Sequence, residues 1–140
     1  MARPYYMRCT VESVGLFELS DGRFQLIRTG PVAPLVTGPG YVLAEHALAE
    51  FLMHSSVSAV RFEPAVIWHR SANVEHHTHK RLIIGHYFSA DQIDDLNLDG
   101  NRLLILDDEY LFASPSLMHC FNQTEFSYLE FSEGLSSFAT

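Results

Sequence analysis

Residues 41–63, YVLAEHALAEFLMHSSVSAVRFE, are matched without a gap by residues 110–132, YLFASPSLMHCFNQTEFSYLEFS. Five identities align the two segments, pairing Tyr41 with Tyr110, Ala44 with Ala113, Leu48 with Leu117, Ser58 with Ser127 and Phe62 with Phe131. Each segment has a short apolar start, apolar residues at helical spacing, and then an alternating run. The pattern predicts a strand–helix–strand unit that occurs twice, with Leu48 and Leu117 buried equivalently. The alternative is two unrelated units that share a pattern because each buries one face.

The other runs of the chain are mostly strand-like. Residues 5–12 alternate in polarity, as in a half-buried strand, and strands are also predicted in 23–28, 57–69, 81–88 and 103–106. The runs 57–69 and 81–88 are predicted to pair as a long hairpin. A short edge strand is expected at Leu35-Val36, and Asp107-Asp108 is expected to turn a tight hairpin. The predicted helices, one over 44–55 and one after Ser114-Pro115, are separated by several strands. We therefore predict an α+β fold, with a largely antiparallel sheet and two helices, rather than a doubly wound parallel sheet.

Two local signals concern the second helix and the end of the chain. Ser114 is a preferred residue before a helix because its side-chain oxygen can accept a free backbone N–H, and Pro115 suits the first helical position. The tail from Ser132 onward is small and polar, so we expect it to be frayed.

The bulk composition fits one domain over residues 1–140, since 47% of the residues are hydrophobic and can fill one core. No apolar run is long enough to span a membrane, and the N-terminus lacks the apolar stretch of a secretory signal. The two cysteines, Cys9 and Cys120, are far apart and are expected to be reduced. These features predict a cytoplasmic protein.

The charge is acidic. Seventeen Asp and Glu residues against nine Lys and Arg residues give a formal net charge of −8. A protein that binds nucleic acid needs clustered cations for the phosphates, and this chain has no such cluster. We therefore do not expect nucleic-acid binding. An acidic surface favours solubility and, where the charge is concentrated, a basic partner.

Histidines are concentrated in the middle of the chain, at His69, His76, His77, His79 and His86. His77 and His79 are two residues apart and would share a strand face, which suits zinc if His76 or another ligand lies nearby. The alternative is a polar loop between two strands in which histidine has no metal to bind. The histidines have no recognisable fourth ligand and no supporting groups around them, so we predict no metal and no cofactor.

Other site motifs are incomplete. Residues 95–100, Asp-Leu-Asn-Leu-Asp-Gly, match the first half of a calcium loop, but Leu106 stands where the bidentate glutamate belongs. The chain has no GxSxG motif and no glycine-rich phosphate loop, and Cys120 falls on a predicted helix at a position expected to pack. No catalytic residue is predicted.

Acidic residues are concentrated between positions 91 and 109. This segment contains Asp91, Asp94, Asp95, Asp99, Asp107, Asp108 and Glu109, with Arg102 as its single cation. Most acidic runs are solvated surface. The alternative is a surface that binds a basic partner, and these seven residues are the predicted partner-binding residues.

Two of the strand signatures resemble those of small bacterial immunity proteins from polymorphic-toxin systems. They are Phe-Ser-Tyr-Leu-Glu-Phe at 126–131 and Val-Ser-Ala-Val-Arg-Phe-Glu-Pro at 57–64, and the order His-Tyr-Phe at 86–88, Gln-Ile-Asp at 92–94 and Leu-Leu-Ile at 103–105 is also similar. The resemblance covers about residues 40–133. It implies a non-enzymatic protein that binds a cognate toxin and blocks it. Some relatives carry paired CxxC motifs, which this chain lacks, and no binding residue is carried over.

The sequence thus supports two functional hypotheses. The first is an immunity-like cytoplasmic protein that neutralises a cognate, basic toxin by direct binding through the acidic segment. The alternative is a small metal-dependent enzyme or metal sensor that uses the histidines between His69 and His86, with His76, His77 and His79 as ligands.

Overall fold

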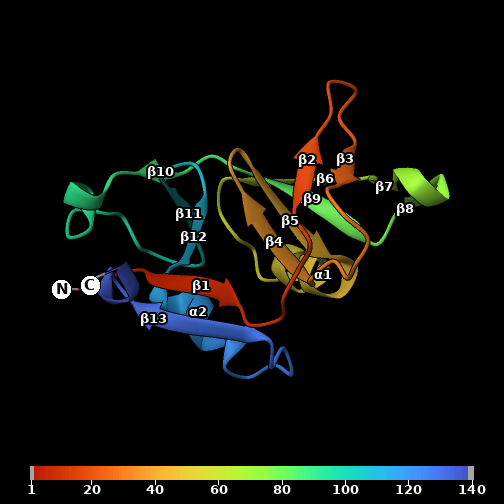
Figure 1. Cartoon of the computed structure of the whole chain (residues 1–140). Helices are drawn as coiled ribbons and strands as arrows, with labels where there is room; N and C mark the ends of the chain where they lie inside the picture. The colour runs from red at the N-terminus through yellow and green to blue at the C-terminus, as the bar shows by residue number, and fades with distance from the viewer. Residues whose placement is uncertain (1, 139–140) are drawn as a thin grey trace.

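The computed structural model describes residues 2–138, which form two α-helices and thirteen short strands (Figure 1). The helices are α1 (His46–His54) and α2 (Pro115–Phe121), and the 3-10 turns are η1 (Arg70–Ala72), η2 (Ala90–Gln92) and η3 (Ser136–Phe138). The strands are β1 (Tyr5–Cys9), β2 (Leu16–Glu18), β3 (Phe24–Leu26), β4 (Leu35–Gly38), β5 (Tyr41–Glu45), β6 (Val60–Pro64), β7 (Ile67–His69), β8 (Val74–His76), β9 (His79–Ile84), β10 (Tyr87–Phe88), β11 (Leu103–Leu106), β12 (Tyr110–Ala113) and β13 (Leu129–Glu133).

The strands form three sheets. The first has the order β10-β11-β12-β1-β13, the second β2-β3-β7-β8 and the third β4-β5-β9-β6. We call them sheets A, B and C. All pairs between named strands are antiparallel except β3 with β7 and β10 with β11. The predicted α+β fold with a mostly antiparallel sheet is confirmed.

The two matched segments form the same elements at the same positions. The first segment forms β5, α1 and β6, and the second forms β12, α2 and β13. The starts of β6 and β13, at Val60 and Leu129, are 69 residues apart, the same spacing as between Tyr41 and Tyr110. The last strands have identical alternation of half-buried and exposed residues. Leu48 and Leu117 are both 0% exposed. The equivalent burial predicted for these two leucines is confirmed.

The correspondence extends beyond the matched segments. In sheet C, β9 lies between β5 and β6, with β4 outside β5; in sheet A, β1 lies between β12 and β13, with β11 outside β12. In sheet C, Leu82 of β9 pairs with Phe62, and in sheet A Met7 of β1 pairs with Phe131. The pairings on the other side of β1 and β9 give the same alignment. Each unit is therefore a hairpin, a helix and a strand around one inserted strand.

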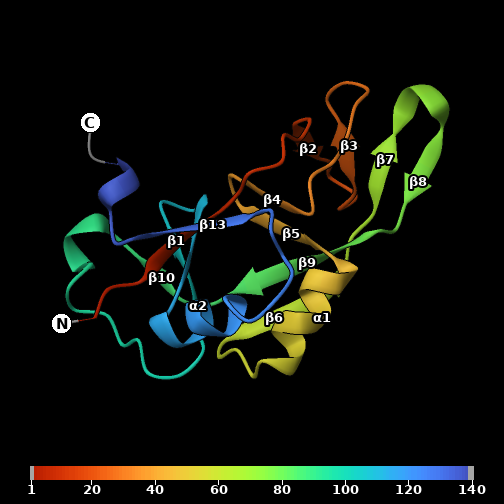
Figure 2. The same ribbon diagram turned by 90° about the horizontal axis from the view of Figure 1, so that it is seen from below.

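One of the two inserted strands, β1, is supplied by a distant part of the chain. β1 precedes the first unit along the chain but lies in the sheet of the second, whereas β9 follows the first unit and completes its sheet. Figure 2 shows β1 beside β13 and α2, although β1 is distant from both in the sequence. Sheet C is built from strands within residues 35–84, whereas sheet A combines β1 with strands of residues 87–133. The N-terminal strand and the C-terminal unit must therefore come together to form sheet A.

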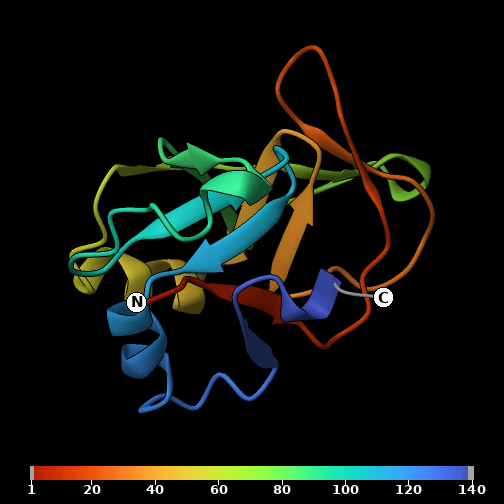
Figure 3. The same cartoon turned by 90° about the vertical axis from the view of Figure 1, so that its left-hand side faces the viewer.

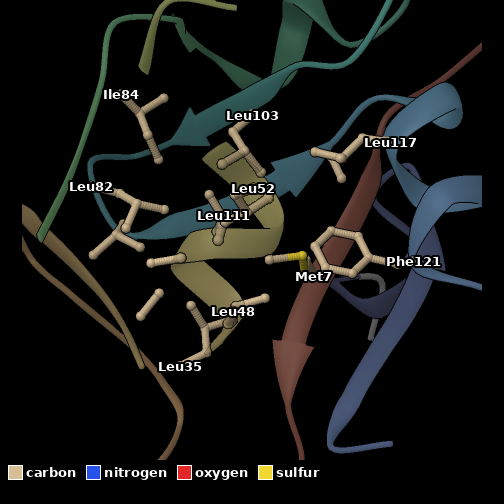
Figure 4. Close-up of a cluster of buried hydrophobic side chains, with 14 of the residues drawn as sticks. Met7, Leu35, Leu48, Leu52, Leu82, Ile84, Leu103, Leu111, Leu117 and Phe121 are labelled. Atoms are coloured by element: carbon tan, nitrogen blue, oxygen red, sulfur yellow. The ribbon is translucent and has the colours of Figure 1, made fainter. Parts of the chain in front are cut away.

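One hydrophobic cluster joins the units. It contains equivalent residues from both, among them Ala44 and Ala113, Leu48 and Leu117, Leu52 and Phe121, Val42 and Leu111, and Leu82 and Met7. Figure 4 shows side chains of α1, α2, β1 and the strands of sheet C meeting in this core. Burial of these apolar side chains on both helices and both sheets is the main source of stability.

The outer faces of sheets A and C have different covers. Sheet B and the loop before β4 cover sheet C, where Phe24 and Ile67 pack with Val36 and Leu43. The segment 89–100 and the C-terminal turn cover sheet A, where Ile93 and Phe138 pack with Phe112. These covers are the parts of the fold that the two units do not share.

Three local expectations are corrected. Residues 132–138 of the tail are held on the fold, because the Phe138 ring packs against Tyr6 and edge-on against Tyr110 and so anchors η3; residues 139–140 lie outside the described residues. Ser114 precedes α2 and Pro115 is its first residue, but the Ser114 hydroxyl makes no cap bond to the helix. It instead accepts from the Arg102 N–H at 2.9 Å and donates to the Gly100 carbonyl at 2.8 Å.

The third correction concerns the run predicted as a long hairpin over 57–69 and 81–88. Its central part, β6 with β9, pairs as expected. Its ends do not pair with each other, because β7 joins sheet B and β10 joins sheet A. Tertiary partners available on either side determine these ends.

Candidate functional site

The predicted partner-binding residues lie along one side of sheet A. Chain 89–100 crosses the outer face of the sheet with Ile93, Leu96 and Leu98 directed to the apolar cluster around Phe88 and Phe112. Figure 3 shows this side, with η2 in front of the strands. The apolar residues hold the segment on the sheet, so its carboxylates are directed outward.

The seven carboxylates form a band from one end of β11 to the other. β10 is parallel to β11 and Phe88 pairs with Leu106, so the chain leaves β10 toward Asp91 at the end where the Asp107-Asp108 turn lies. It then returns to Asp99, which precedes β11. We call Asp91, Asp94, Asp95, Asp99, Asp107, Asp108 and Glu109 the acidic band. The structure therefore places all seven predicted residues on one side of the fold.

Most of the acidic band is open to solvent and little neutralised. All members except Glu109, which is half-buried, are exposed. Within residues 2–138, one member has a cation within 4.0 Å: Asp94 accepts from Arg3 Nε at 2.8 Å. Both side chains of that pair are about half exposed, with 50% and 43% of their surface open. A pair of this kind contributes at most about 1 kcal/mol, so the band keeps its negative field.

The turn at the end of the acidic band is conformationally restricted. Asp107 and Asp108 have φ angles of 54° and 57°. These values lie in the left-handed region, which residues other than glycine rarely adopt. The Asp108 carbonyl accepts the Gly40 N–H at 2.9 Å, so the β11–β12 turn lies against the β4–β5 turn of the other unit. This contact fixes the direction of the turn.

The histidines line a cavity on the other side of the molecule. It has a volume of about 700 Å³, and three separate segments line it: the chain from β3 to β4, the start of α1, and the chain from β7 to β9. Five of the eight histidines belong to it, namely His46, His69, His76, His77 and His79. We call it the histidine cavity.

His79 is the buried member of the set. Its side chain is 3% exposed, its Nε2 lies 2.8 Å from the Ala33 carbonyl, and its Nδ1 lies 2.8 Å from Thr78 Oγ1. A carbonyl can only accept, so Nε2 carries the proton and Nδ1 accepts from the threonine hydroxyl. Burial lowers the pKa of His79, with His46 acting in the same direction, against the raising effects of the Ala33 carbonyl and of Glu45. The ring is therefore a neutral structural group.

This arrangement separates the three histidines of the metal hypothesis. His76 ends β8 and His77 lies in the connection, both exposed, whereas both ring nitrogens of His79 are occupied by protein partners. Among residues 2–138, no three His, Cys, Asp or Glu side chains are placed to hold one metal ion. The structure thus does not assemble His76, His77 and His79 into a ligand set.

His69 connects the histidine cavity to a second hollow of about 450 Å³. Its Nε2 lies 3.2 Å from Thr29 Oγ1 and 3.0 Å from Ser71 Oγ. The second hollow shares Leu26, Thr29 and His69 with the first and adds Arg28 and Arg70. We call it the arginine hollow.

Several cavity residues were not predicted. His46, Thr29, Arg28 and Arg70 come from segments that carry no motif. The pairing of β3 with β7 brings Thr29, Arg28 and Arg70 to His69, and the pairing of β5 with β9 brings His46 to His79. A long-range parallel pair leaves no local signal in the sequence. His86, in contrast, was grouped with the other histidines but does not line the cavity. Burial, with Arg102 as the smaller cause, lowers the pKa of His86.

Comparison with protein-family models, with curated proteins and with solved structures finds no match. In the described part of the chain, no helix has the length and apolar character needed to cross a membrane. Cys9 and Cys120, both half-buried, are free thiols.

Proposed function

We propose that the chain is an immunity-like, non-enzymatic cytoplasmic protein that binds a basic protein toxin through the acidic band. The observation that supports this most is the exposure of six carboxylates, four on the supported segment 89–100 and two on the β11–β12 turn. Among the described residues, a single ion pair involves any of them. A binding segment that is already held in place loses less conformational freedom when a partner docks. Here Ile93, Leu96 and Leu98 anchor it to sheet A.

Carboxylates held close together repel one another, and a partner with clustered Lys or Arg relieves that repulsion on docking. A nuclease toxin is one such partner, because its active site is basic in order to hold phosphates. Attraction at long range also accelerates the encounter, with a range of about 8 Å at physiological ionic strength. The acidic band suits fast capture of a basic active site.

The test measures association and dissociation rates against basic proteins encoded by neighbouring genes, over a range of salt concentrations. We expect the association rate to fall steeply with salt while dissociation changes little. Reversal of Asp94, Asp95 and Asp99 to Lys should slow association by about tenfold or more. Circular dichroism should show that the variant is folded.

A matched control reverses three exposed acids outside the band, Glu12, Glu50 and Glu125, to Lys. It makes the same change in net charge at different sites. Equal slowing in both triple variants would show a general effect of net charge. A wild-type association rate at low salt in the Asp94, Asp95 and Asp99 variant would show that the band is solvated surface.

A further inference from the structure

The histidine cavity has the size and chemistry of a ligand site. Its volume of about 700 Å³ lies within the range of about 300–1,000 Å³ that is typical of small-molecule sites. Leu26 and Ile67, which are 8% and 1% exposed, supply a buried apolar wall. The imidazoles and the Thr29 and Thr78 hydroxyls supply hydrogen-bonding groups around it.

The arginine hollow gives one end of this space a positive charge. Arg28 and Arg70 are both exposed, and within residues 2–138 neither lies within 4.0 Å of a carboxylate, although the chain has seventeen Asp and Glu residues. The nearby Arg23 differs, because Asp21 and Glu75 neutralise it. A guanidinium group with no acidic partner can bind a carboxylate or phosphate through two parallel hydrogen bonds.

The opposite end has the opposite charge. Glu45 lines the histidine cavity but not the arginine hollow. An anionic group of a ligand is therefore favoured near Arg28 and Arg70 and disfavoured near Glu45. His69 lies between the two spaces. Its Nε2 can accept a hydrogen bond from one of the two hydroxyls that contact it, Thr29 and Ser71, so at least one hydroxyl is free to donate to an oxyanion.

We infer that the joined cavity binds a small organic anion, a phosphate or carboxylate attached to an apolar body. The apolar body lies against Leu26 and Ile67. The anionic group lies at the boundary marked by His69, where Arg28 and Arg70 reach it. The site is separate from the acidic band, so each can fail without the other.

The inference is tested with four probes: phenyl phosphate, benzoate, inorganic phosphate and phenol. Binding to the full chain is measured by calorimetry, and the ring resonances of the eight histidines are followed by NMR. We expect saturable binding of phenyl phosphate or benzoate that shifts the His69 ring. Inorganic phosphate lacks the apolar body and phenol lacks the anion, so each should bind at least about tenfold more weakly.

The variant Arg28→Gln with Arg70→Gln should weaken binding of the organic anion by about tenfold or more. Arg8→Gln with Arg61→Gln is the control, since both arginines are exposed and lie outside the two hollows. It should bind like the wild type. Backbone NMR spectra should show that both variants are folded.

Three results would overturn the inference. The first is that neither organic anion shows saturable binding up to about 10 mM, a concentration well above the dissociation constant of a specific site. Another is equal loss of affinity in the two double variants, which would indicate a general effect of charge. The third is equal affinity for inorganic phosphate and phenyl phosphate, which would remove the apolar body from the assignment.

Discussion

The two units share one scaffold, and they differ in what covers it. Their hairpins, helices and strands have the same order around an inserted strand, and their inner faces contribute equivalent residues to one core. The outer face of sheet C carries sheet B and the histidine cavity, whereas the outer face of sheet A carries the acidic band. Packing constrains the inner faces of both units alike, while the connections outside them are free to carry different chemistry.

The largest expected effect tests the equivalence of the cores. Leu48→Ala and Leu117→Ala each remove a fully buried side chain from the shared cluster. Each should lower the free energy of unfolding by about 2–5 kcal/mol, measured by urea denaturation. Similar values, with both variants unfolding in a single transition, are expected because the two units share one core. Separate transitions for the two units would contradict the shared core.

The residues before the two helices should differ in effect. Ser114 is fully buried and bonds the Arg102 N–H and the Gly100 carbonyl, whereas its counterpart Glu45 is exposed. Ser114→Ala should destabilise the fold by about 1–3 kcal/mol because it leaves two backbone groups unpaired. Glu45→Ala should change stability by less than about 0.5 kcal/mol. Equal losses in urea denaturation would mean that both residues act only through their helices.

The two hairpin turns offer a smaller contrast. Gly40 has a φ of 80° in the first turn, and Asp108 has a φ of 57° in the second. Gly40→Ala should cost about 1–2 kcal/mol, since a Cβ there strains the backbone. Asp108→Gly should raise the free energy of unfolding by up to about 1 kcal/mol. Glycine relieves the backbone strain at this φ angle, and we expect this gain to exceed the loss from the greater conformational entropy of the unfolded chain. Thermal denaturation of the two variants measures both signs, and a destabilised Asp108→Gly protein would refute the strain at that turn.

The smallest expected effect concerns pH. His79 in β9 and the buried Pro4 before β1 occupy equivalent positions in the register of the two sheets. At this position only the unit that contains His79 has a titratable side chain. Burial lowers the pKa of His79 below the 6.5 of an ordinary histidine. Between the pKa of the folded state and that of the unfolded state, the unfolded state binds more protons. The contribution of His79 to stability is therefore present above about pH 6.5 and is lost as the pH falls below it.

His79→Gln should therefore lose less stability than the wild type between about pH 7.5 and about pH 5.5. Urea denaturation at the two pH values measures the difference. His119→Gln, at an exposed site of α2, is the control and should follow the wild type. An unchanged pH dependence in His79→Gln would mean that Glu45 compensates for the burial of the ring.

The sequence by itself determined the repeated strand–helix–strand units and the α+β class. Alternation and helical spacing are local consequences of burying one face, so Leu48, Leu117 and the strands after each helix could be placed from residue patterns alone. The sequence also located the acidic residues of 91–109, since their charge is visible without a structure.

Tertiary structure alone decided how the pieces join. The insertion of β1 into the sheet of the second unit, the pairing of β3 with β7, and the position of His46 beside His79 all connect distant segments. Local pattern contains no information about such partners, because a strand exposes the same hydrogen-bonding groups to any neighbour. The choice among neighbours is made by which apolar faces pack in the whole fold, and that choice created the histidine cavity and left Arg28 and Arg70 at its edge.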